Sequence, residues 1–187
     1  MSSVDLENLK KLDYPPLTED LEEAKEHLDI YGLALVKNVL SNEEVSEMDV
    51  RLTEQFHGEE KNKVGSKVRG DEGLGVESSE EDKVSRLVWN LVNKGDCFLK
   101  LIDHPKILPL IQHIIGERVC LCSMGAHMNG SGNERMALHQ DQWPLVPHPM
   151  EFPFMANVMY LISDNSPENG GTRLIPGSHK WPVIDYR

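Results

Sequence analysis

Two residues of types that bind metal ions, His139 and Asp141, are separated by the single residue Gln140. On a β-strand alternate side chains point to the same side, so the imidazole and the carboxylate can bind one metal ion while Gln140 faces away. Such a pair supplies two of the three ligands of a 2-His-1-carboxylate iron(II) site, which leaves three coordination positions open. A His-x-Asp tripeptide also arises by chance, and a surface histidine beside an aspartate is the alternative interpretation.

Strands are expected around this pair because the second half of the chain has the periodicity of β-structure. Residues 119–124, 136–143 and 154–162 each have the composition of half-buried or buried strands. Connections rich in glycine, proline and serine separate them. The pair therefore lies on the middle one of three predicted strands.

The first half of the chain is expected to supply a helical layer. A helix capped by Thr18 and ended by Gly32 leads into a predicted strand at 33–39. A capping box formed by Ser41 and Glu44 then begins a second helix. These elements are expected to position the strands and to carry no chemistry themselves.

Two further helices are predicted from apolar residues at helical spacing, one from Val84 up to Gly95 and one at 107–115, which ends at Gly116. Residues 57–80, before them, contain few large apolar side chains and predict a long loop. The loop is interpreted either as a lid over a site or as a solvated insertion. It is expected to be poorly ordered without substrate, because it offers little apolar area to offset the entropy of fixing it.

Composition limits the classes of partner. The net charge is −12 and the pI is about 5.1, which argues against a nucleic-acid partner or an anionic membrane surface. No basic and apolar leader and no membrane-spanning run is found, so no membrane association is expected. Three cysteines without zinc-ligand spacing favour a reducing compartment, and a cytoplasmic location is predicted.

Beyond the metal pair, the second half of the chain contains a longer and more specific pattern. A Gly-Gly-Thr-Arg sequence is followed by Pro-Gly-Ser-His, and a hydrophobic strand lies between this pattern and the metal pair. In order and spacing these stretches closely resemble the phytanoyl-CoA dioxygenase family. The stretches that carry the resemblance are residues 138–142, 156–161 and 168–181.

The resemblance implies a fold and a chemistry. The fold of that family is a double-stranded β-helix, or jelly roll, with helices packed on one sheet, so the fold class expected is α+β with a mainly β core. The cofactors implied are Fe(2+) and the cosubstrate 2-oxoglutarate, which together oxidise a small organic substrate, usually at an unactivated C–H bond. A secondary metabolite or a lipid-like molecule is the substrate class expected.

Matching the motif residue by residue implies a role for five side chains. His139 and Asp141 would be iron ligands, and Thr172 would donate a hydrogen bond to a carboxylate of 2-oxoglutarate. Asn157 and Gln142 are expected to line the same pocket. His179, in the Pro-Gly-Ser-His turn, is expected to stabilise that turn and not to bind metal.

The sequence also departs from the family pattern. The second metal-binding histidine and the arginine that binds 2-oxoglutarate come later in the family, and neither has a counterpart here. The last strands of the jelly roll are expected to be missing as well. A single domain is predicted for residues 1–187, with a helical and entry-strand layer at 1–118 and jelly-roll strands at 119–187, incomplete at its C-terminus.

Three functions remain open on the sequence. The first is an oxygenase that obtains its missing parts elsewhere, the second an inactive truncated product, and the third a non-catalytic jelly-roll module that binds a small molecule. Self-association or a partner chain at the open edge of the sheet is expected. The chain on its own is expected to show little or no turnover of 2-oxoglutarate, because two ligands hold iron less tightly than three.

Overall fold

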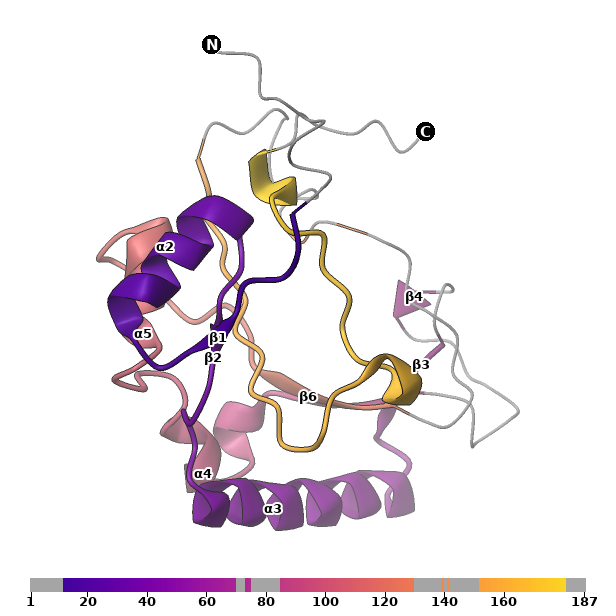
Figure 1. The fold of residues 1–187 in the computed structure, drawn as a ribbon. Helices are drawn as coiled ribbons and strands as arrows, with labels where there is room; N and C mark the ends of the chain where they lie inside the picture. Colours follow the sequence, from indigo (N-terminus) through magenta and orange to yellow (C-terminus); the bar gives the residue numbers. More distant parts are fainter. Residues whose placement is uncertain are drawn as a thin grey trace.

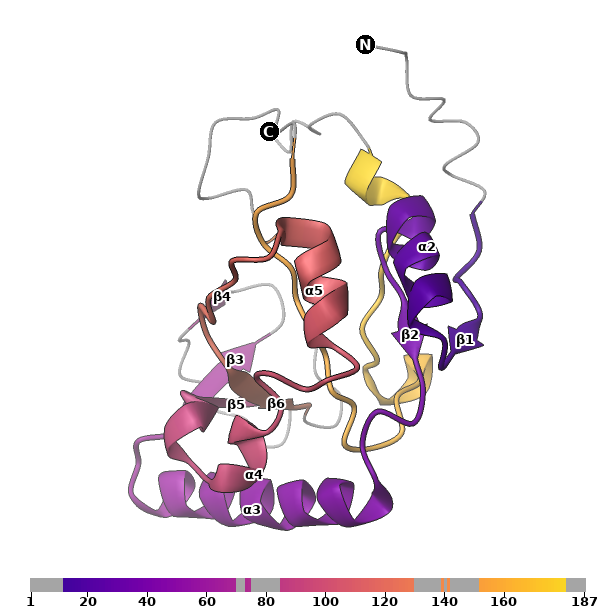
Figure 2. The same ribbon diagram turned by 90° about the vertical axis from the view of Figure 1, so that its left-hand side faces the viewer.

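The computed structural model describes residues 12–69, 73–74, 85–129, 139, 141 and 152–180. Two helices, α2 (Leu21–Tyr31) and α5 (Leu108–Ile115), lie beside the short strands β1 (Leu17–Thr18) and β2 (Leu35–Val36) (Figure 1). Two others, α3 (Asn42–Lys61) and α4 (Asp96–Leu99), lie beside a second, larger sheet. Residues 152–180 form a long, mostly irregular segment that passes between α5 and the pair α2 and β2 (Figure 2). The Pro-Gly-Ser-His motif lies in this segment, whereas His139 and Asp141 precede it in the chain.

Helix α2 (Leu21–Tyr31) begins two residues later than predicted. Asp20 is its N-cap and accepts hydrogen bonds from the backbone of Glu22 and Glu23. Thr18, the expected cap, is buried in β1 (Leu17–Thr18), and its hydroxyl accepts from the Asp20 N–H at 3.0 Å. The predicted end at Gly32 is confirmed, since this residue has φ +73°, a conformation that favours glycine.

The strand expected at 33–39 is shorter than predicted. Only β2 (Leu35–Val36) forms, and it pairs in parallel with β1. The capping box is confirmed: Ser41 accepts from the Glu44 N–H at 3.2 Å and donates its own N–H to the Glu44 carboxylate at 2.8 Å. This cap begins the long helix α3 (Asn42–Lys61).

The prediction of a continuous loop at 57–80 is wrong for those of its residues that the structure describes. Helix α3 continues to Lys61 because Glu59 accepts hydrogen bonds from Gln55 at 2.9 Å and from Lys94 at 2.8 Å. Two strands then follow, β3 (Ser66–Arg69) and β4 (Gly73–Leu74). The other residues of the predicted loop lie outside the described part of the chain.

The helix expected from Val84 up to Gly95 is wrong over its first half. Residues Ser85–Trp89 form strand β5, which pairs antiparallel with β3 on one side and with β6 (Gly125–Met128) on the other. The sheet order is β4-β3-β5-β6. A central strand is buried on both faces, so its apolar residues need not alternate, and a short apolar run of this kind fits a helix or a strand equally well.

The core lies between α3, β5 and α4 (Asp96–Leu99), with the 3-10 turn η2 (Leu91–Asn93) joining the last two. Phe98, Met48 and Val88 are its largest fully buried side chains. Helix α5 (Leu108–Ile115), predicted at 107–115, packs instead against α2. Among the described residues, no helix is both long and apolar enough to cross a membrane.

The strands expected in the second half of the chain are largely absent from the described residues. No strand forms at 119–124 or at 154–162, and 136–143 is described only at His139 and Asp141, neither of which is in a strand. Strand β6 is the exception, and it lies just after the first predicted strand. The prediction of a mainly β core is therefore wrong for this part of the chain, in which more residues lie in helices than in the small antiparallel sheet.

Candidate functional site

His139 and Asp141 lie next to one another. The Nε2 atom of His139 is 3.4 Å from Oδ1 of Asp141, and about half of each side chain is exposed. The two side chains are close, as predicted. Asp141 lies in a turn, however, so alternation along one strand is not the reason for their closeness. A turn also brings residues two apart together, because it reverses the chain within four residues.

Asn157 joins this pair from a separate part of the chain. Its side-chain amide donates a hydrogen bond to Oδ2 of Asp141, the oxygen that does not face His139. The two carboxylate oxygens therefore have different partners, which sets the rotation of the carboxylate. Amides that hold a carboxylate in this way are typical of the residues behind the ligands in metal sites.

The spacing of the pair suits a divalent cation. Two ligand atoms that lie about 2.1 Å from a cation and at right angles about it are about 3.0 Å apart. The observed 3.4 Å between Nε2 and Oδ1 differs from this by an amount that a small rotation of either exposed side chain removes. Within the described residues, however, no cluster of three or more His, Cys, Asp or Glu side chains forms a complete metal site.

Asn157 is held in place by the segment around it. The Tyr160 hydroxyl donates a hydrogen bond to the Leu101 carbonyl at 2.9 Å, and Tyr160 and Ile162 pack against the core. Burial raises the pKa of Tyr160 to about 12, so this hydroxyl keeps its proton and remains a donor at any physiological pH. The sequence does not predict this hydrogen bond, because Tyr160 is one of several apolar or aromatic residues in the predicted strand.

The Glu-Asn-Gly-Gly part of the motif forms a tight turn, η3 (Pro167–Asn169). The Asn169 side chain accepts from the Ser166 N–H at 2.8 Å and donates to the Asp164 carbonyl at 2.5 Å. Gly170 follows with φ +84° and accepts at its carbonyl a hydrogen bond of 3.0 Å from Asn129, the residue after β6. These residues attach the segment to the end of the sheet.

The Pro-Gly-Ser-His turn is attached to the opposite group of elements, at the end of α2. The Gly177 N–H donates to the Tyr31 carbonyl at 2.6 Å, and Nε2 of His179 donates to the Asp29 carbonyl at 3.3 Å. A Cβ atom on Gly32 would lie 2.2 Å from Nδ1 of His179. His179 therefore stabilises this turn, as the sequence predicts, and the chain requires glycine at position 32 to admit it.

The remaining predicted site residues do not join the pair in the described part of the chain. Thr172 is exposed in the irregular stretch between η3 and η4 (Ser178–Lys180). Gln142 lies outside the described residues. His127, which is not one of the predicted site residues, lies on β6 opposite Leu87, and burial lowers its pKa. The roles given to Thr172 and Gln142 remain predictions.

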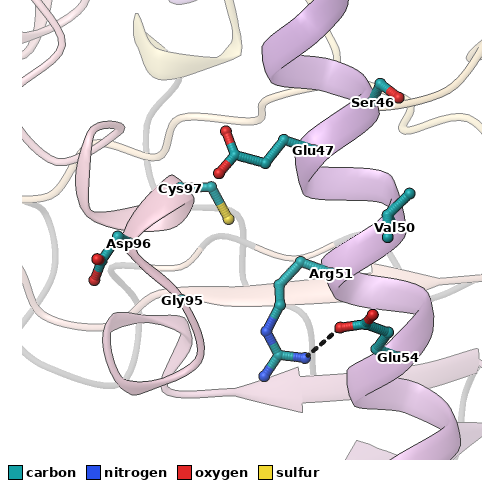
Figure 3. Close-up of a pocket in the computed structure, with 8 residues that line it drawn as sticks. All are labelled: Ser46, Glu47, Val50, Arg51, Glu54, Gly95, Asp96 and Cys97. Atoms are coloured by element: carbon teal, nitrogen blue, oxygen red, sulfur yellow. Dashed lines mark ion pairs between the residues drawn. The ribbon is translucent and has the colours of Figure 1, made fainter.

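A groove of about 520 Å³ lies elsewhere, between α3 and the start of α4 (Figure 3). Arg51 in its wall donates from Nε to the Lys94 carbonyl at 2.6 Å and pairs with Glu54 at 3.7 Å. Burial is the first cause that raises the pKa of the Cys97 thiol, and the charge of Glu47 adds to it, so this thiol is unreactive. The groove contains none of the predicted site residues, and Arg51 joins α3 to the turn that precedes α4.

Comparison with protein families gives a match over residues 28–187 to the family described as phytanoyl-CoA dioxygenase (PhyH). The chain belongs to this family. Its members are iron(II)- and 2-oxoglutarate-dependent dioxygenases, and the matched range includes His139, Asp141, Asn157 and both turns of the motif. The family implies a jelly roll, of which the described residues show only a small β portion. No solved structure matches the chain significantly.

Curated relatives share this family character. The chain is 28% identical over 165 residues to "Dioxygenase af480" of Aspergillus fumigatus, covering 88% of this chain and 51% of that protein. It is 28% identical over 169 residues to a "Probable alpha-ketoglutarate-dependent hypophosphite dioxygenase" of Stutzerimonas stutzeri, covering 89% and 56%. A third, "Dioxygenase sphC" of Aspergillus fumigatus, is 24% identical over 172 residues, covering 87% and 46%. The chain thus spans about half the length of these relatives.

Proposed function

We propose that this chain carries the metal-binding part of an iron(II)- and 2-oxoglutarate-dependent oxygenase that oxidises a small organic substrate. The observation that supports the proposal is the distance of 3.4 Å between His139 Nε2 and Asp141 Oδ1, with Asn157 bound to the other carboxylate oxygen. When bound, iron and 2-oxoglutarate supply the oxidising power for attack on a C–H bond. A secondary metabolite or a lipid-like molecule is the substrate class proposed.

In this proposal the residues of the chain bind the metal ion and orient the cosubstrate. The His139 imidazole and the Asp141 carboxylate supply one nitrogen and one oxygen ligand, a donor set that suits a non-haem iron(II) ion. Asn157 holds Oδ2, so Oδ1 stays directed toward the side on which His139 lies. Thr172 and Gln142 are proposed as hydrogen-bonding residues for the carboxylates of 2-oxoglutarate.

Metal binding can be tested without turnover. Titration of the purified protein with Mn²⁺, followed by electron paramagnetic resonance, should show one weak site. Replacing either ligand, by His139→Ala or Asp141→Ala, should weaken that binding at least about tenfold, since each removes one of two protein ligands. The matched control is His57→Ala, an exposed histidine on α3, which should leave binding unchanged. Binding that survives both ligand substitutions would overturn the proposal.

Turnover is a separate measurement. Succinate production is followed with iron(II), ascorbate and 2-oxoglutarate, with His139→Ala as the control. The chain on its own should produce only traces, because the proposed ligands His139 and Asp141 are two of the three that such a site needs, and no group of three forms among the described residues. Robust succinate formation that is lost in His139→Ala would show that a further group of this chain completes the site.

A further inference from the structure

The hydroxyl group of Tyr14 binds both backbone groups of one residue in the family motif. It accepts a hydrogen bond of 2.9 Å from the Leu174 N–H and donates one of 2.8 Å to the Leu174 carbonyl. In an antiparallel sheet one residue of the partner strand bonds both of these groups. The Tyr14 hydroxyl therefore takes the place of a strand partner at Leu174, although the two residues are 160 positions apart in the sequence.

The segment that carries Tyr14 is held in one conformation. Pro15 and Pro16 follow it, and the residue before a proline is confined to extended backbone, while each proline fixes its own φ. Pro15 is buried, and strand β1, which pairs with β2, begins directly after Pro16. The Tyr14 hydroxyl is therefore presented by a rigid support, and little conformational entropy is lost when it binds Leu174.

Thr172 lies between two points at which the chain is fixed. Before it, the Gly171 N–H donates to the Ser166 carbonyl at 2.8 Å. Two residues after it, both backbone groups of Leu174 are bound by Tyr14. The backbone at Thr172 has little freedom to rotate while both contacts hold, so the position of Thr172 depends on the Tyr14 hydroxyl.

We propose that Tyr14 is a positioning residue for the cosubstrate. By holding Leu174, it keeps Thr172 in the place from which the Thr172 hydroxyl binds a carboxylate of 2-oxoglutarate. A hydrogen bond between two oxygens needs them about 2.5–3.0 Å apart, so a displacement of Thr172 by about 1 Å loses it. This inference rests on the function proposed above, in which Thr172 binds 2-oxoglutarate.

Removal of one hydroxyl, by Tyr14→Phe, tests the inference. Calorimetric titration of 2-oxoglutarate into the Mn²⁺-loaded protein should show an affinity lower by about two- to tenfold, the effect of one net hydrogen bond. Mn²⁺ affinity measured without 2-oxoglutarate should be unchanged, because Tyr160 and not Tyr14 holds the segment that carries Asn157. A general loss of structure would lower both affinities, and that result would overturn the proposal.

The matched control is Tyr31→Phe, which removes a hydroxyl from a tyrosine at the end of α2. Among the described residues, Tyr31 contacts His27 with its ring and binds the Gly177 N–H with its backbone carbonyl. Neither contact involves the Tyr31 hydroxyl. Both affinities should therefore be unchanged in Tyr31→Phe, and an equal loss of 2-oxoglutarate affinity in the two variants would overturn the proposal.

A double variant separates positioning from an independent structural effect. If Tyr14 acts through Thr172, its hydroxyl has no further effect once the Thr172 hydroxyl is absent. Tyr14→Phe combined with Thr172→Ala should then bind 2-oxoglutarate as Thr172→Ala alone does, whereas independent losses multiply. Multiplied losses overturn the proposal, as does unchanged 2-oxoglutarate affinity in Tyr14→Phe or in Thr172→Ala.

The contact itself can be measured without any ligand. Amide hydrogen exchange at Leu174, followed by nuclear magnetic resonance, should be faster in Tyr14→Phe than in the unchanged chain and should be unaffected in Tyr31→Phe. Equal exchange in Tyr14→Phe and the unchanged chain overturns the proposal at its first step. An unchanged chain that binds no Mn²⁺ is instead a failure of the oxygenase proposal, which also removes the cosubstrate role of Tyr14 but leaves the exchange result intact.

Discussion

At the level of single residues, Asp141 uses its two carboxylate oxygens differently. Oδ2 accepts from the Asn157 amide, while Oδ1 faces His139 at 3.4 Å. Fixing one oxygen lowers the entropy that the carboxylate would lose on binding a cation. If Asp141 is a metal ligand as proposed, Asn157 would contribute to metal affinity without touching the metal ion.

Asn157→Ala should weaken Mn²⁺ binding by about tenfold, since loss of a residue behind a ligand typically costs 10–100-fold. Isothermal titration or paramagnetic resonance measures the change. Asn93→Ala is the control, because Asn93 is an exposed asparagine on η2. Unchanged Mn²⁺ affinity in Asn157→Ala would show that the amide does not orient Asp141.

Protonation of His179 should destabilise the fold. Burial is the main cause that lowers the pKa of this side chain from its ordinary value of 6.5, and the hydrogen bond to the Asp29 carbonyl opposes this lowering without reversing it. Below pH 6.5 the unfolded chain therefore binds a proton that the folded chain does not. The free energy of unfolding should be highest above pH 6.5 and should fall as the pH drops through it.

Burial also lowers the pKa of His127, so this residue adds to the loss of stability as the pH falls. Urea denaturation at pH 7.5 and pH 5.5 measures the change in stability for the unchanged chain and for His179→Gln. The loss between the two pH values should be smaller in His179→Gln, because one of the two histidines no longer titrates. An equal loss in both proteins would contradict the role given to His179.

At the level of elements, the end of α2 and the Pro-Gly-Ser-His turn form one unit. Gly32 has φ +73° and no space for a Cβ atom, because His179 Nδ1 would be 2.2 Å away. Gly32→Ala should therefore destabilise the protein by about 1–2 kcal/mol for the left-handed conformation alone, and by more for displacing His179. Thermal and urea denaturation measure the change.

The matched control is Gly58→Ala in α3. No atom lies within 4 Å of a Cβ atom added at Gly58, and the residue is helical. Alanine is favoured over glycine in a helix by up to about 1 kcal/mol, so this variant should be slightly more stable. If Gly32→Ala were as harmless as Gly58→Ala, the turn would not be packed against α2 in solution.

At the level of the whole molecule, one core joins α3, β5 and α4, and two neighbouring residues test it. Phe98 is 1% exposed and Leu99, beside it, is 42% exposed. Phe98→Ala should cost about 3–5 kcal/mol, because it leaves a cavity in the core. Leu99→Ala should cost less than about 1 kcal/mol. Chemical denaturation measures the free energy of unfolding of both variants. Similar losses in the two would show that Phe98 is not part of the core.

The sequence alone determined the features that depend on neighbouring residues. The capping box at Ser41, the glycine that ends α2 and helix α5 are set by contacts within a few residues, and all three are confirmed. The family could also be predicted, because its motif is a specific order of residue types. The closeness of His139 and Asp141 follows from their spacing, although a turn and not a strand produces it.

Tertiary structure decided what depends on partners distant in sequence. Ser85–Trp89 is a strand because β3 and β6 lie on either side of it, and its short apolar run by itself fits a helix as well. The bond from Asn157 to Asp141, and the contact of His179 with the end of α2, join residues that only the folded chain brings together. Local sequence sets the preferences of each segment, but burial and hydrogen bonding between segments select among them.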